Sequence, residues 1–100
     1  SFIAIKDIEQ LIDLTKKDIR DIQDANYDNI SKRVTKKNHL AISFETHKSL
    51  LDDELSKKAK NNPLENTLDN SDRKLLEELK TKLSKLKKKN REYAKYIVKL

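Results

Sequence analysis

Glycine is missing from all 100 residues of the chain, although average usage would supply about seven per hundred. Tight turns, β-hairpins and phosphate-binding loops depend on glycine, because it adopts backbone angles that other residues avoid. The chain also has a single proline and few aromatic residues, while 40% of its residues are charged. This composition is typical of long solvated helices with narrow apolar faces. We therefore predict an all-α protein.

Cysteine is absent as well. Without it neither a disulfide framework nor a thiolate metal site can form, which suits a reducing cytoplasm. No apolar run approaches the ~20 residues that a membrane-spanning helix needs, and no signal peptide is visible. We expect a cytoplasmic protein that does not insert into membranes. Methionine is missing even at position 1, and the apolar pattern still runs at Leu100, so we expect a piece of a longer chain.

Histidine and carboxylate side chains offer little for catalysis. His39 and His47 are eight residues apart, too far to share one metal ion, and a third ligand is lacking. The acidic run at 52–54 is typical of a solvated surface, because tuning the pKa of a carboxylate requires burial. We expect no enzyme, no cofactor, no metal and no small-molecule substrate.

Positive charge is concentrated at the end of the chain. From residue 71 onward the balance of basic and acidic residues is 11 − 4 = +7, whereas residues 1–70 carry 12 − 13 = −1. Such a run can bind phosphates by releasing counterions. No aromatic side chain is interleaved with it to stack on bases, so we favour a solvated basic face over a nucleic-acid site.

Two helices are predicted before residue 61. The first, at 2–25, carries a row with alternating spacings of three and four: Ile5, Ile8, Ile12, Thr15, Ile19 and Ile22. The second, at 27–60, carries a row that is out of phase with the first: Ile30, Val34, Ala41, Phe44, Leu51 and Leu55, with Lys37 and Lys48 in polar slots. The slip in phase predicts a tight corner, with Asn26 in the left-handed conformation at the helix end. A continuous kinked helix stays open.

The third predicted helix, at 70–100, follows a loop at 61–69. Pro63 cannot continue the second helix because it lacks a backbone N–H. Asp69, Asn70 or Ser71 is expected to cap the third helix.

This third helix has the most regular apolar row in the chain, a repeat typical of a coiled-coil seam. Its members are Leu76, Leu79, Leu83, Leu86, Tyr93, Ile97 and Leu100, with Asn90 in the one missing position. Burying these side chains is worth on the order of 10 kcal/mol before entropy costs, so something must cover them. Two readings stay open: the third stripe of a closed three-helix antiparallel bundle, or a groove for another protein.

The last turns favour a partner. Tyr93, Tyr96, Ile97, Val98 and Leu100 make the helix apolar on more than one side, which a narrow seam does not need. An asparagine on the seam more often fixes register with a partner than fills a dry core. We expect partner binding at Leu79, Leu83, Leu86, Asn90, Tyr93, Tyr96, Ile97 and Leu100.

Over nearly its whole length the chain resembles the flagellar export chaperones of the FlgN family. The resemblance is carried by Ile8 to Ile22, Asp24-Ala25-Asn26, Ile30 to Leu40, Phe44, Lys48-Ser-Leu-Leu51 and Asn90-Arg-Glu-Tyr93. Most of it is helical periodicity with lysines.

The resemblance implies a cytoplasmic chaperone of type III secretion, which holds hook-associated filament-junction proteins and delivers them to the flagellar export gate. In such chaperones the last amphipathic helix takes the C-terminal helices of the substrate. Here the matching positions are Leu79, Leu83, Leu86, Asn90, Tyr93 and Ile97. The family often has a second asparagine where this chain has Tyr93. Its gate-docking tyrosine lies in a tail beyond the globular part, so neither Tyr93 nor Tyr96 inherits that role.

Two other functions stay open. A structural coiled-coil module would self-associate as a homodimer through the same row. A basic helical domain that binds nucleic acid is disfavoured for the reason given above.

Overall fold

The computed structural model describes residues 2–61 and 69–100, which form three helices. These are α1 (Phe2–Gln23), α2 (Tyr27–Asn61) and α3 (Asn70–Val98). Within the described ranges there is no strand, so the prediction of an all-α helical bundle is confirmed. Most of the predicted loop, including Pro63, lies outside the described residues. None of the described helices combines the length and the apolar character needed to cross a bilayer.

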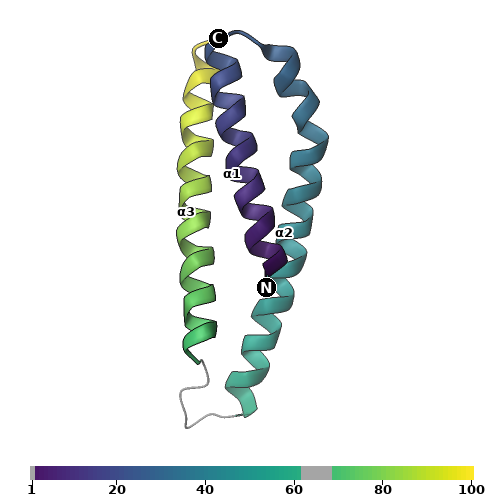
Figure 1. Ribbon diagram of the computed structural model, residues 1–100, viewed down its shortest axis with the longest axis vertical. Coiled ribbons are helices and arrows are strands. Elements are labelled where there is room, and N and C mark those ends of the chain that lie inside the picture. Colours follow the sequence, from purple (N-terminus) through teal and green to yellow (C-terminus); the bar gives the residue numbers. More distant parts are fainter. Residues whose placement is uncertain (1, 62–68) are drawn as a thin grey trace.

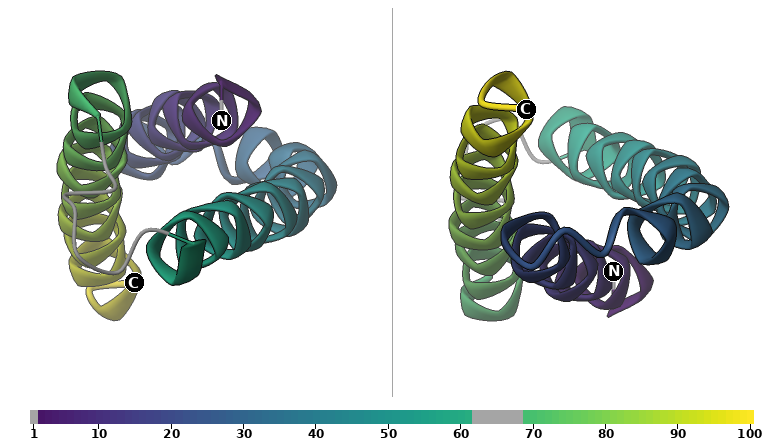
Figure 2. Two further views of the ribbon diagram at one scale, coloured as in Figure 1. Left: turned by 90° about the horizontal axis from the view of Figure 1, so that it is seen from below. Right: turned by 90° about the horizontal axis from the view of Figure 1, so that it is seen from above.

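The bundle is elongated, measuring 56 × 20 × 19 Å. The chain rises along α1, descends along α2 and rises again along α3, so α2 is antiparallel to both of its neighbours (Figure 1). α1 packs against α2 and against α3. Viewed along the bundle, the three helices tilt in different directions, like the sides of a triangle (Figure 2).

Burial is concentrated on the central helix. Half of α1 is buried, 11 of its 22 residues, because it is covered on two sides. Among the described residues of α3, Leu79 alone is buried, and α2 adds Phe44 and Leu51. The low mean hydropathy of the chain fits this arrangement, since α2 and α3 expose most of their described residues to water.

α1 carries a second row beside the predicted isoleucines. Asp7 accepts a hydrogen bond from Ser43, and Asp18 accepts one from Arg33, so this row faces α2. Its members, again spaced by three and four, are Ala4, Asp7, Leu11, Leu14, Asp18 and Asp21.

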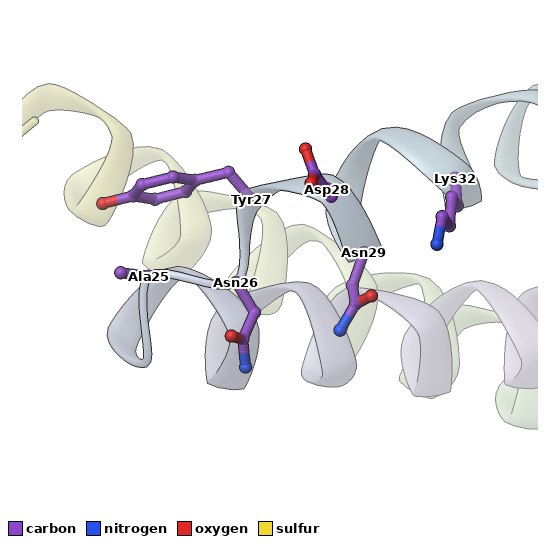
Figure 3. A pocket seen from close by; sticks show the side chains of 6 residues that line it. All are labelled: Ala25, Asn26, Tyr27, Asp28, Asn29 and Lys32. Carbon is purple, nitrogen blue, oxygen red and sulfur yellow. The ribbon is translucent and has the colours of Figure 1, made fainter.

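The corner between α1 and α2 is a tight turn, not a continuous kinked helix (Figure 3). The N–H of Asn26 donates to the carbonyl of Asp21 at 2.7 Å, and the N–H of Ala25 donates to that of Ile22 at 3.4 Å. This is the Schellman arrangement, which requires a left-handed residue just before the last donor. Ala25 has φ 60°, so the prediction of Asn26 for this position was wrong by one residue.

The phase predicted for α2 was partly wrong. Val34 is 51% exposed and Ala41 is exposed as well. Arg33 and Leu40 are half-buried in their place. The reason is that α2 turns the Arg33 side chain toward the carboxylates of α1, which leaves Val34 and Ala41 on the side toward α3.

The N-terminus of α3 is capped by Asp69. Its side chain accepts a hydrogen bond of 2.8 Å from the N–H of Asp72. Of the three caps proposed from sequence, the structure selects the first.

Candidate functional site

The first half of the predicted partner row belongs to the core. Leu79 is 6% exposed and lies in a cluster with residues of both other helices: Ala4, Ile5, Ile8, Ile12, Phe44 and Leu51. Leu83 and Leu86 are half-buried and pack against this cluster. These three leucines serve the fold, and a partner can reach only the exposed edges of Leu83 and Leu86.

Tyr93 and Tyr96 are half-buried and are held by the other helices. The Tyr96 hydroxyl accepts a hydrogen bond of 2.6 Å from the Gln23 amide of α1. The Lys37 ammonium of α2 lies 5.7 Å from the centroid of the Tyr93 ring, within cation–π range. Burial raises the pKa of Tyr93, and the negative charge of Asp18 raises it further. The two tyrosines therefore tie the end of α3 to the bundle.

The remaining predicted residues are open to solvent. Asn90 is exposed, Ile97 is 44% exposed and Leu100 is 72% exposed. Asn90 was expected in the buried row but is exposed, and the preceding residue, Lys89, is half-buried instead. The buried face rotates along α3 because this helix is tilted against α1 (Figure 2).

A network of charges between α1 and α2 was missed by the sequence reasoning. Asp18 is 2% exposed and accepts hydrogen bonds from Arg33 at 2.8 Å and from Lys37 at 2.9 Å. Arg33 also donates to Asp21. The hydrogen bond from Arg33 lowers the pKa of Asp21 against a smaller opposing effect of burial. Every buried polar side-chain atom of the described residues has a partner.

One sequence signal could have revealed this network. Asp7, Asp18 and Asp21 share the second 3-4 row of α1, and the basic residues Arg33 and Lys37 are four residues apart on the next helix. Acidic residues on an apolar row predict a basic partner, because a buried charge is costly when it is unpaired.

Ser43 and His47 form a small polar cluster with Asp7. The Ser43 hydroxyl donates to the Asp7 carboxylate. His47 Nδ1 lies 2.7 Å from the Ser43 carbonyl oxygen, which only a protonated nitrogen can approach as a donor. In that arrangement His47 Nδ1 cannot also take a proton from the Ser43 hydroxyl.

A groove separates α2 from α3. In the described parts of the two helices, no Cα atom of one comes within 8 Å of a Cα atom of the other. Their side chains enclose a mostly apolar cavity of about 310 Å³, lined by Phe44, Lys48, Leu51, Asp52, Leu76, Leu79, Lys80 and Leu83.

Two contacts define how α2 and α3 run past each other. Lys58 Nζ lies 2.8 Å from Asp72 Oδ2, and Lys37 lies over the ring of Tyr93. The two contacts are 21 residues apart on both helices, from Lys58 back to Lys37 on α2 and from Asp72 forward to Tyr93 on α3. The two helices are antiparallel and stay level with each other over this length.

Each wall of the groove carries a row spaced by seven residues, which lies on one helix face. On α2 it is formed by Val34, Ala41 and Lys48, and on α3 by Leu76, Leu83, Asn90 and Ile97. Lys48, Leu76 and Leu83 line the cavity. The other members continue both walls toward the corner and are exposed.

Lysines also gather where α1 meets α3. Lys16, Lys82 and Lys85 surround one shallow pocket together with acidic residues, and Lys82 lies 3.3 Å from Glu9. The nearby charge of Lys16 lowers the pKa of Lys85. The basic surface expected from the sequence therefore extends from α3 onto α1.

The part of the chain that the structure describes contains no group of three or more His, Cys, Asp or Glu side chains that could hold a metal ion. Comparison of the chain with protein-family models, curated proteins and solved structures found no match.

Proposed function

We propose that this protein is a cytoplasmic chaperone of type III secretion. It binds hook-associated filament-junction proteins of the flagellum through α3 and delivers them to the export gate. The proposal combines the resemblance described above with one structural observation: the end of α3 leaves its apolar side chains uncovered.

Ile97, Val98 and Leu100 are 44%, 86% and 72% exposed. Apolar side chains gathered on an exposed helix end are typical of a surface that takes a partner helix. Asn90 lies on the same face as Ile97, one heptad earlier, where a polar side chain can select the register of the partner. Tyr93 and Tyr96 anchor this part of α3 to the other two helices, so the exposed surface is held in a fixed position on the bundle.

The test is copurification of the full-length protein from its own cytoplasm, with the bound species identified by mass. We expect flagellar filament-junction subunits at stoichiometric amounts. The double variant Ile97→Asp, Leu100→Asp should lose them and keep its helicity, because both side chains are exposed.

Ile42→Asp is the matched control, since Ile42 is 66% exposed on a different face of α2. This variant should bind as the parent does. The proposal fails if no filament-junction subunit is recovered with the parent, or if the control loses the subunit as completely as the double variant.

A self-associating structural module would use the same exposed side chains. Native mass separates the two functions. A monomer, or a dimer that dissociates when the partner is added, supports chaperoning, whereas a stable dimer that the double variant breaks supports a structural role. Recovery of nucleic acid that is lost at high salt would indicate the basic surface instead.

A further inference from the structure

We infer that the groove between α2 and α3 is the seat of a fourth helix, an acidic amphipathic helix of about three heptads supplied by the partner. The inference rests on the proposed function for the class of partner. It adds α2 as the second wall of the site.

The arrangement of the three helices leaves this position open. Both α2 and α3 pack closely on α1, whereas in their described parts no Cα atom of one comes within 8 Å of a Cα atom of the other, and only side chains join them. A helix added across this gap would complete a four-helix bundle around one core. Lys48 and Asn90 are the polar members of the two walls that would meet this fourth helix, and most of the other side chains there are apolar: Val34, Ala41, Leu76, Leu83 and Ile97.

The length of the groove sets the length of the occupant. The row on α3 extends from Leu76 to Ile97, which is about 32 Å at ~1.5 Å per residue. The row on α2, from Val34 to Lys48, lies beside the C-terminal part of the α3 row, because the two helices are antiparallel and their paired residues advance at the same rate. A helix of about 21 residues would cover both rows.

The edges of the groove select the charge of the occupant. Lys48 and Lys80 line the cavity, and Asp52, the one acidic residue there, lies 3.2 Å from Lys48. Lys87 is exposed and follows Lys80 by seven residues, so it continues the basic edge of α3. Acidic side chains on the flank that faces α3 would therefore find the basic partners Lys80 and Lys87, and Lys48 adds one basic side chain on α2.

A second copy of this chain fits the groove poorly. The chain has a net charge of +6, and residues 71–100 account for 11 − 4 = +7. Placing a second α3 along the groove would set lysine rows against each other, which costs free energy and slows association.

Two synthetic 21-residue peptides can test the inference on the full chain. They share one helical apolar row and differ only at the flanking positions, which are glutamate in one and lysine in the other. We expect the acidic peptide to bind at least tenfold more tightly in calorimetric titration. In NMR spectra of the chain, the backbone amide chemical shifts that change most on adding the peptide should be those of residues on the two walls: Val34, Ala41, Leu83 and Asn90.

Charge reversal supplies the decisive variants. Lys80→Glu with Lys87→Glu should weaken the acidic peptide at least tenfold and strengthen the basic one. Lys74→Glu with Lys88→Glu is the matched control, because both lysines are exposed and point in other directions from α3 than Lys80 and Lys87. On α2, Val34→Asp should weaken binding and Thr35→Asp should not, since Thr35 points away from the groove.

The inference is overturned if neither peptide binds, or if both reversals act equally. It is also overturned if binding depends on Ile97 but not on Val34, Lys80 or Lys87, and in that case the proposed function survives with a site on α3 alone. If the full-length protein recovers no filament-junction subunit while the acidic peptide still fills the groove, the proposed function fails and the groove stands.

Discussion

The Asp18 carboxylate of α1 accepts a hydrogen bond of 2.8 Å from the Arg33 guanidinium of α2 while 2% exposed to solvent. This pair agrees with buried Phe44 and Leu51 in fixing which side of α2 faces α1. With Arg33 directed at α1, its neighbour Val34 lies on another side of α2 and is 51% exposed.

Asp18→Asn should lower the free energy of unfolding by about 2 to 3 kcal/mol. The substitution leaves Arg33 and Lys37 without the buried carboxylate, and removing one partner of a fully buried pair costs ~3 to 5 kcal/mol. We expect less here because the two basic side chains keep 19% and 23% of their surface in water. Urea unfolding measures the change. The same substitution at exposed Asp13 should change stability by less than about 0.5 kcal/mol.

The interaction between Asp21 and Arg33 should make stability depend on pH. The pKa of Asp21 lies below its ordinary value of 3.8 in the folded chain. Its contribution is therefore complete above that value and is lost as the pH falls through the lower, folded pKa. In urea titrations from pH 7 to pH 2.5, the difference between the parent and Asp21→Asn should shrink toward zero at the acid end. A difference that stays constant would show that the charge of Asp21 contributes nothing.

Ala25→Gly should stabilise the protein by about 1 kcal/mol. Ala25 has φ 60°, a conformation that costs an L-residue ~1 to 2 kcal/mol and glycine almost nothing, although glycine loses more entropy on folding. Ala41→Gly, at an exposed position inside α2, should instead destabilise by about 1 kcal/mol. Thermal unfolding of the two variants should therefore shift in opposite directions.

The two halves of α3 should respond differently to alanine. Leu79→Ala removes a buried side chain from the core cluster and should cost about 2 to 4 kcal/mol. Ile97→Ala, at a side chain that is 44% exposed, should cost less than about 1 kcal/mol. Equal losses would mean that the end of α3 is ordinary core.

Much of the fold could be predicted from the sequence because it depends on neighbours along the chain. The three helices follow from apolar periodicity and the lack of glycine, and the cap at Asp69 from a side chain that bonds its own helix. The corner was predicted from a phase slip that included Val34 and Ala41, and both of these are exposed, so part of its argument was wrong. The error at the corner was one residue. It arose because the backbone pattern assigns the left-handed position to Ala25 even though asparagine tolerates it better.

The candidate site was less predictable. Leu79, Leu83, Leu86, Asn90 and Ile97 fit one repeat, yet they divide between the core and the solvent. The repeat identifies the residues that share one face of α3. Because the helices are tilted, this face packs against the other helices at Leu79 but is open to solvent at Ile97.

The sequence by itself determined an all-α chain with a basic last helix, because composition and periodicity act locally. Only the tertiary structure decided which faces are covered. The buried carboxylate of Asp18 accepts a hydrogen bond from Arg33, and α1 lies between the other two helices. A groove remains between α2 and α3, whose Cα atoms stay more than 8 Å apart in the described parts. That outcome depends on charge pairing and crossing angles between distant segments, which no repeat within a single helix encodes.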